Sequence, residues 1–271
     1  LAPSGTTAAE LAAADDPGGP VPPIAAVPTT AGTGAETNGF GVIESADRRK
    51  VYLGSDRTVP ALVVLDPALT VGLPATVTAA SGFDAVIHGA ESLLSRGATA
   101  TSRAFAAESL RLTTSALARA VADGTDLEAR SRMLTGAHLA GRALTLSGLG
   151  LVHGIGHSLT ATLGTPHGSA LATVVGPALR LGIDAHPAGY ADLARALGLP
   201  DGPGSAEAAV QALVDLAAEV GLATGLADLD VSGDVVDVLA DKTLDDPVIA
   251  NSPVHPGRAQ LIGLLRATAQ R

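Results

Sequence analysis

Apolar positions recur with a helical period through most of the chain after residue 74. They return every three or four residues, the spacing that places them on one face of an α-helix. The proline at position 74 suits a helix start, because its missing N–H would have no partner there. The pattern predicts helices at 75–95, 99–122, 126–147, 149–163, 167–182, 187–196, 205–222, 231–243 and 256–269.

Short apolar runs separated by turn residues mark the first 73 residues instead. Residues 24–27 predict a short buried strand and residues 61–66 another strand. Two more runs, 39–43 and 51–53, flank a charged turn and predict a hairpin. One short helix is expected at 7–14. These elements are too few to cover a sheet on both faces, so they are either a minor layer on the helices or part of a larger domain.

Composition narrows the classes of function. Apolar residues make up 46% of the chain but aromatic residues only 2%, so the core must be built from Ala, Leu and Val. A formal charge of −10 argues against nucleic acid or an anionic membrane surface as a partner. Cysteine is absent, which excludes a disulfide framework and a thiolate metal site. No apolar run could span a bilayer and the first residues do not resemble a signal peptide, so we expect a cytoplasmic protein.

Histidines and an aspartate gather in two short stretches. His153 and His157 are four residues apart, and His167 follows in a Pro-His-Gly sequence. Asp84 and His88 are also four apart, which places them on one face of a helix. Neutral imidazole and carboxylate are ligands for divalent iron and zinc. The sequence therefore offers five candidate ligands for one ion, and spacing alone does not exclude any of them.

Four motifs, in order, resemble those of the iron-containing alcohol dehydrogenase family, which shares a superfamily with glycerol dehydrogenase and dehydroquinate synthase. They are PTTAGTGAE at 28–36, DPALTVGLP at 66–74, GFDAVIHGAE at 82–91 and the stretch from GLGLVH to PHG at 148–168. Residues 250–253 are a looser match to the family's ending. One such motif alone would be weak evidence, but four at the family spacing are specific.

The resemblance implies a dinucleotide-binding α/β domain followed by a helical metal-binding domain. Residues 1–73 would be an α/β remnant of the first domain, and residues 74–271 the mainly α-helical catalytic domain. The family's GGGSxxD phosphate loop has no match in this chain. We therefore expect that about a hundred residues of the nucleotide-binding domain are missing, and that this chain alone binds NAD or NADP poorly. The full-length form is expected to be a homodimer.

The family's motifs also assign the site residues. By resemblance a divalent ion, Fe2+ or alternatively Zn2+, is held by Asp84, His88, His153 and His167. His157 would instead face the nicotinamide and the substrate, as a proton-relay or positioning group. Glu91, one turn beyond His88, could support the ligands, although a solvated charge is slightly favoured.

Cofactor contacts are implied for the threonine-rich loop and its surroundings. By resemblance Thr29, Thr30 and Thr33 contact the cofactor. Asn38 stands where the family often has threonine, and Lys50 occupies the family's lysine position near the ribose.

A few positions depart from the family pattern. Three of them, expected near the substrate pocket, leave the substrate open: Ala35, Ser158 and Thr160. The remaining histidines match no family ligand and are expected to be structural or on the surface: His138, His186 and His255.

The function implied is a metal-dependent alcohol dehydrogenase or aldehyde reductase. It would transfer hydride between NAD(P) and a small alcohol or carbonyl compound, with the metal polarising the substrate oxygen. A dehydroquinate synthase-like cyclase is disfavoured, because that family has glutamate in the first helix and extra basic residues for a substrate phosphate. A non-catalytic metal-binding fragment without a complete cofactor site is the other alternative.

Overall fold

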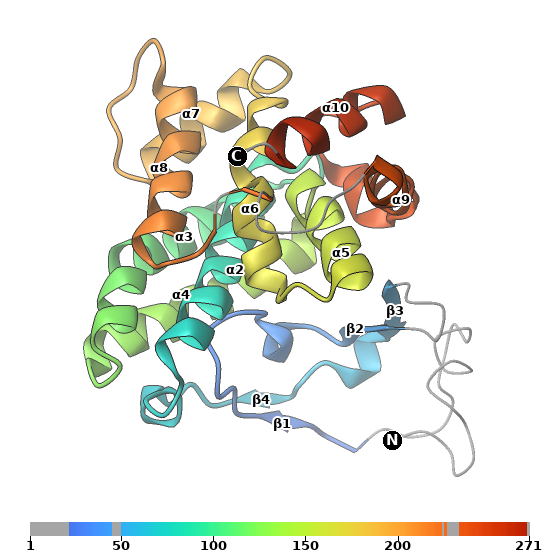
Figure 1. Ribbon diagram of the computed structural model, residues 1–271. Coiled ribbons are helices and arrows are strands. Elements are labelled where there is room, and N and C mark those ends of the chain that lie inside the picture. Colours follow the sequence, from blue (N-terminus) through green and yellow to red (C-terminus); the bar gives the residue numbers. More distant parts are fainter. Residues whose placement is uncertain (1–21, 45–49, 224, 227–232, 270–271) are drawn as a thin grey trace, which may run out of the picture.

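The computed structural model describes residues 22–44, 50–223, 225–226 and 233–269, and helices dominate it (Figure 1). Each helix predicted after residue 74 is present, with its ends within three residues of the expected positions. The helix expected at 7–14 lies outside the described residues. The helices are α2 (Ala75–Leu94), α3 (Ala100–Ala122), α4 (Leu127–Ser147), α5 (Leu151–Leu163), α6 (His167–Arg180), α7 (Pro187–Ala196), α8 (Ser205–Glu219), α9 (Gly233–Asp245) and α10 (Arg258–Ala269).

Local sequence signals set several helix ends. Thr99 begins α3 with a capping box in which its hydroxyl and that of Ser102 each accept a backbone N–H. Asp126 caps α4 by accepting from the backbone N–H of Ala129. Gly164 ends α5 in the left-handed conformation, with φ 71°. These caps explain why sequence periodicity located the helices so closely.

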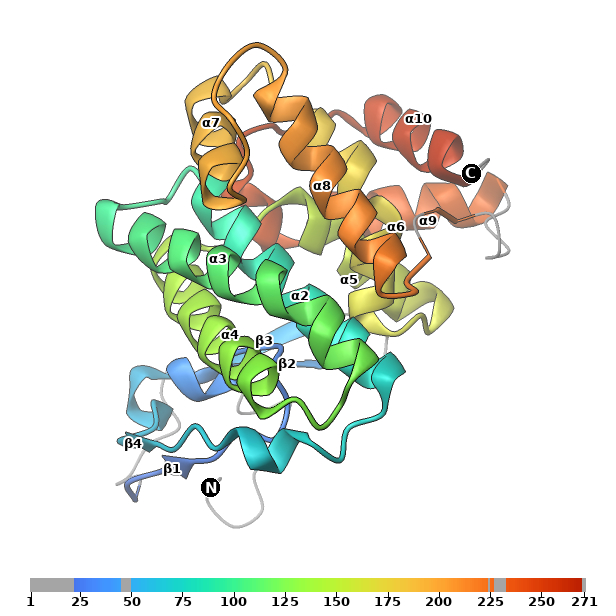
Figure 2. The same cartoon turned by 90° about the vertical axis from the view of Figure 1, so that its left-hand side faces the viewer.

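Helix α2 runs through the centre of the molecule, between the α3–α4 pair and the α5–α6 pair (Figures 1 and 2). Its core side chains include Phe83 and Ile87, both fully buried. Helices α2 and α3 can approach closely because residue 82 is glycine. A Cβ atom there would lie 2.4 Å from Leu117 Cδ1. No helix of the described residues is long and apolar enough to cross a membrane.

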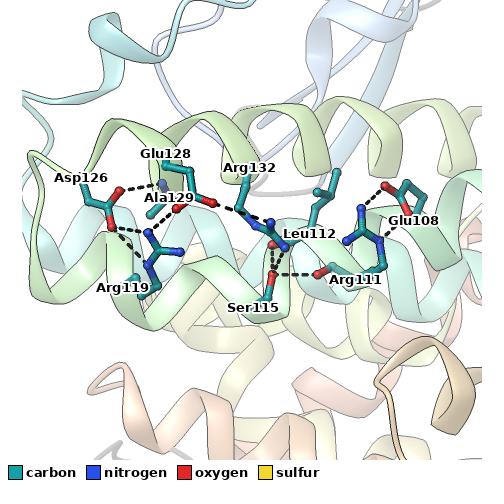
Figure 3. A network of polar contacts seen from close by, with 9 residues as sticks. All are labelled: Glu108, Arg111, Leu112, Ser115, Arg119, Asp126, Glu128, Ala129 and Arg132. Atoms are coloured by element: carbon teal, nitrogen blue, oxygen red, sulfur yellow. Dashed lines mark hydrogen bonds and ion pairs between the residues drawn. The ribbon is translucent and has the colours of Figure 1, made fainter.

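A row of ion pairs joins the exposed surfaces of α3 and α4 (Figure 3). Arg119 of α3 contacts Asp126 at 2.7 Å and Glu128 at 2.6 Å. Arg132 of α4 donates to the Ser115 hydroxyl at 2.7 Å. Because all of these charged groups are at least partly exposed to solvent, their ion pairs add little to the free energy of unfolding.

The strands form two separate pairs. β1 (Ala25–Ala26) lies parallel to β4 (Leu62–Val63), and β2 (Phe40–Glu44) is antiparallel to β3 (Lys50–Gly54), which confirms the predicted hairpin. The prediction that the first strand is buried was wrong. Val27 is 47% exposed and Leu62 is 57% exposed, because the described part of the chain leaves the outer face of this pair uncovered.

The threonine-rich loop at 28–36 rests directly on helices α2 and α4. Gly34 has φ 61°, and a Cβ atom there would lie 2.7 Å from the Cα of Gly141 in α4. Glu36 in the short helix η1 (Ala35–Thr37) lies 3.1 Å from His138 Nδ1. At Gly32, a Cβ atom would lie 3.0 Å from the backbone oxygen of Ser81 in α2. His138 thus has the structural role expected of it.

Helix α6 crosses α2 at Gly168, and this contact gives a testable prediction. A Cβ atom at this position would lie 1.9 Å from the carbonyl oxygen of Ala80. Because the positions of the Cβ atom and of the carbonyl oxygen are both fixed by helix backbones, Gly168→Ala should lower the free energy of unfolding by about 2–4 kcal/mol. Urea denaturation measures this change.

Gly263 in α10 supplies the matched control, because a Cβ atom there would have no neighbour within 4 Å. Gly263→Ala should leave stability unchanged or raise it by about 0.5–1 kcal/mol. Equal midpoints for the two alanine variants would contradict the prediction.

Candidate metal centre

The carboxylate of Asp84 in α2 lies at the centre of three imidazoles that come from three helices. His88 is one turn further along α2, His153 lies in the first turn of α5, and His167 is the first residue of α6. Their Nε2 atoms lie 3.4, 3.4 and 3.6 Å, respectively, from Asp84 Oδ1. The potential ligand atoms of Asp84, His88 and His153 lie within 4.8 Å of one another. The four residues expected to be ligands therefore converge on one point.

Two atoms at this point lack the partners that their burial requires. Asp84 Oδ1 and His153 Nε2 are buried and have no hydrogen-bond partner, an arrangement that costs free energy unless a ligand compensates for it. Tetrahedral ligands about 2.1 Å from a zinc or iron ion are roughly 3.4 Å apart. The donor set and its spacing therefore fit one divalent ion.

The electrostatics prepare three of the four groups for a cation. Burial opposes ionisation of Asp84, but the imidazoles around it hold its pKa well below the usual range. Burial lowers the pKa of His88 to about 4 and that of His167 to about 3, so both rings are neutral at pH 7. Burial also opposes protonation of His153, but the carboxylate of Asp84, 3.4 Å from Nε2, and that of Glu91, 2.6 Å from Nδ1, raise its pKa to about 9.

Glu91 belongs to the interior, so the expectation of a solvated charge was wrong. Glu91 is only 4% exposed, because the N-terminus of α5 covers this face of α2. Its Oε2 atom lies 2.6 Å from His153 Nδ1. The same carboxylate accepts the backbone N–H groups of Gly150, Val152 and His153.

His157 lies beside the cluster but has a different partner. Its Nδ1 atom is 2.7 Å from Asp246 Oδ2. Its ring stacks on His167 at 5.3 Å and stands edge-on to His153 at 6.0 Å. Asp246 was missed in the sequence, where only its place before Pro247 marks it as a cap of the short helix η4 (Pro247–Asn251).

A cavity of about 700 Å³ opens above the histidines. Thr33 and Asn38 also line it. Its apolar wall is formed by Phe40, Val42, Leu144, Leu149, Pro247 and Val248. The site therefore combines a buried polar floor with an apolar wall, a combination typical of small-molecule sites.

Two of the other residues expected to contact the cofactor, Thr29 and Thr30, do not line this cavity. Thr30 lines an adjoining hollow of about 530 Å³ together with Thr33 and Asn38. Thr29 is exposed and lines neither hollow. Lys50 is the first residue of β3, where its backbone pairs with Glu44.

The three positions that depart from the family pattern do not all line the cavity. Ala35 lines it, as expected. Ser158 does not, because it is buried, where its hydroxyl donates to the Ile155 carbonyl at 2.8 Å and accepts from the Thr243 hydroxyl at 3.0 Å. Thr160 is also absent from the lining, so the expectation that all three lie near the substrate pocket was wrong.

Sequence comparison places the chain in a family. The profile of the C-terminal region of the iron-containing alcohol dehydrogenase family matches residues 78–269. The iron-containing alcohol dehydrogenase profile matches residues 4–67. The chain belongs to the iron-containing alcohol dehydrogenase family.

Individual relatives agree with this assignment. The chain is 34% identical over 252 residues to 1,3-propanediol dehydrogenase of Citrobacter freundii, covering 91% of this chain and 65% of the relative. It is 35% identical over 239 residues to lactaldehyde reductase of Escherichia coli (strain K12), covering 86% of this chain and 62% of the relative. The chain thus spans less than two thirds of the length of these curated relatives.

Solved structures show the same fold. A 1,3-propanediol oxidoreductase superposes with a TM-score of 0.88 at 32% identity, covering 93% of this chain and 67% of that one. Sulfoacetaldehyde reductase from Bifidobacterium kashiwanohense, solved in complex with NAD+, gives a TM-score of 0.85 at 31% identity, covering 91% of this chain and 65% of that one.

Proposed function

We propose that this chain carries the metal- and substrate-binding part of an NAD(P)-dependent alcohol dehydrogenase or aldehyde reductase. The observation that carries the proposal is the group of three imidazole Nε2 atoms around the unpartnered Asp84 Oδ1, at the floor of a cavity. Residues 74–271 would form the catalytic domain, and residues 1–73 would belong to the nucleotide-binding domain. A cytoplasmic location and a homodimeric full-length form stay predictions.

The proposed ligands of the ion are Asp84, His88, His153 and His167, with Fe2+ expected and Zn2+ as the alternative. A divalent ion bound there would supply a Lewis acid for the oxygen of an alcohol or carbonyl substrate. The two neutral imidazoles need no deprotonation before they bind it.

His157 is proposed to exchange the proton of the substrate hydroxyl. Because Asp246 accepts at Nδ1, the Nε2 atom is left as the proton acceptor. The ring lines the cavity, which is where a general acid or base must lie to reach the substrate.

The threonine loop is proposed to form one wall of the NAD(P) site. Thr33 and Asn38 border both the metal-side cavity and the adjoining hollow that Thr30 lines. Contacts from Thr29 and Lys50 stay predictions. The structure of the sulfoacetaldehyde reductase relative, in complex with NAD+, supports a nicotinamide cofactor for this fold.

The cavity lining favours a dehydrogenase over a cyclase. Among the described residues it contains no lysine or arginine, the side chains that a phosphate-bearing substrate would need. The apolar wall suits a short carbon chain, as in the alcohols and aldehydes named for the relatives.

The proposal is tested in two steps. First, the Co2+-substituted chain should change its visible spectrum when a short primary alcohol is added. Second, a version extended at its N-terminus with the phosphate-loop segment of a relative should oxidise NADH or NADPH in the presence of propanal or lactaldehyde. A metal-loaded extended protein that is inactive with both cofactors and a panel of short aldehydes would overturn the proposal in favour of a non-catalytic metal-binding chain.

A further inference from the structure

We propose that Glu91 is a positioning residue of the metal centre, which holds the His153 ring so that Nε2 faces Asp84. The inference rests on the proposed metal site and deepens it. None of the sequence motifs assigns this role uniquely, since a glutamate one turn beyond His88 could equally be solvated.

The carboxylate of Glu91 is fully engaged by one neighbouring segment. Oε1 accepts the Val152 N–H at 2.7 Å, and Oε2 accepts the N–H groups of Gly150 at 3.2 Å and His153 at 3.3 Å. Oε2 also lies 2.6 Å from His153 Nδ1. With donors on both oxygens, the carboxylate has little freedom to rotate or shift.

Those backbone groups are the unpaired donors at the start of α5. The residue before the helix is Gly150, which has no side chain to cap it, so the first N–H groups need an acceptor from elsewhere. Glu91 supplies it from α2, and its negative charge suits the positive end of the helix dipole. One carboxylate thus fixes both the start of α5 and the ring of a residue in its first turn.

Fixing Nδ1 leaves Nε2 as the only ring nitrogen of His153 available to an ion. That atom is buried, lacks a hydrogen-bond partner and lies 3.4 Å from Asp84 Oδ1. His157, one turn further along α5, has its Nδ1 held by Asp246 instead. The two carboxylates therefore give two adjacent histidines of one helix different orientations.

The glycine at position 150 is part of this arrangement. A Cβ atom there would lie 2.9 Å from Glu91 Oε1. An alanine would therefore push the carboxylate away from its donors. Gly150→Ala disturbs Glu91 without changing its chemistry and gives a second, independent variant.

The experiment measures Zn2+ affinity of the 271-residue chain by competition with a chromophoric chelator. Glu91→Gln removes the charge and replaces one acceptor oxygen with an NH2 group that faces donors. It should weaken Zn2+ binding about 10- to 100-fold, the usual effect of losing such a partner. Gly150→Ala should weaken binding in the same direction. In the Zn2+-loaded wild type, nitrogen NMR should show the His153 proton on Nδ1.

Tyr190→Phe is the control for loss of a buried hydrogen bond. Its hydroxyl donates to the Leu179 carbonyl, and Tyr190 lines the same small cavity as Glu91 without hydrogen-bonding to a histidine. This variant should lose thermal stability but keep wild-type Zn2+ affinity.

Two results would overturn the inference in different ways. If Glu91→Gln and Gly150→Ala lower the melting temperature but bind Zn2+ as the wild type does, Glu91 is only a helix cap. If the wild-type chain itself binds no Zn2+ or Fe2+, the proposed metal site fails and the inference fails with it. Should Glu91→Gln not fold, unchanged affinity in Gly150→Ala decides against the proposal.

Discussion

Replacing Asp84 and His167 together by alanine should abolish the binding of Fe2+ or Zn2+. The wild-type chain should hold about one ion after anaerobic loading and dialysis, the count expected of a single site. The double variant loses the only carboxylate among the four proposed ligands and one imidazole, and two histidines alone hold a divalent ion weakly. Elemental analysis of the dialysed proteins measures the difference.

A matched pair of substitutions away from the site controls for the loss of one acid and one histidine. Asp241 and His255 are both exposed, and neither lines the cavity. Asp241→Ala with His255→Ala should keep the full ion content. If the Asp84 and His167 double variant also keeps full occupancy, the proposed ligand set is wrong.

Single substitutions at two neighbouring histidines should give opposite metal contents. His153→Ala should lose the ion, because this ring faces Asp84. His157→Ala should keep most of it, because Asp246 holds that ring by Nδ1. In an extended version that turns over alcohol, His157→Ala should lower kcat by about 10²- to 10⁴-fold, the usual contribution of a general acid or base.

Comparison of the two variants by elemental analysis, with circular dichroism to verify folding, decides between the roles. Equal loss of metal would show that His157 is a ligand, and one of the four proposed ligands would then not bind the ion.

The helices could be predicted because their signals are local. Apolar spacing located each one, and capping residues such as Thr99 and Asp126 lie within a turn of the ends they set. Burial of the strand at 24–27 could not be predicted in the same way. It depends on what covers the strand, and a short apolar run looks the same whether or not its neighbour is present.

The candidate site shows the same limit. The four-residue spacing predicts that Asp84 and His88 share one helix face, and likewise His153 and His157. The family resemblance predicts which of the five candidates bind the ion together. The partners of the rings were harder to find. Glu91 meets His153 across 62 residues of sequence and Asp246 meets His157 across 89, so no local pattern connects them.

The contacts of the threonine-rich loop with two helices determine how the loop can move. The loop touches α2 at Gly32 and α4 at Gly34, in both places with backbone close to backbone. It should therefore move together with α2, the helix that carries Asp84 and His88. The hairpin of β2 and β3 is a separate unit, and its Phe40 and Val42 side chains form part of the cavity wall. Redesign of those two side chains should alter which molecules enter, while the distance from the loop to the metal floor stays set by the helices.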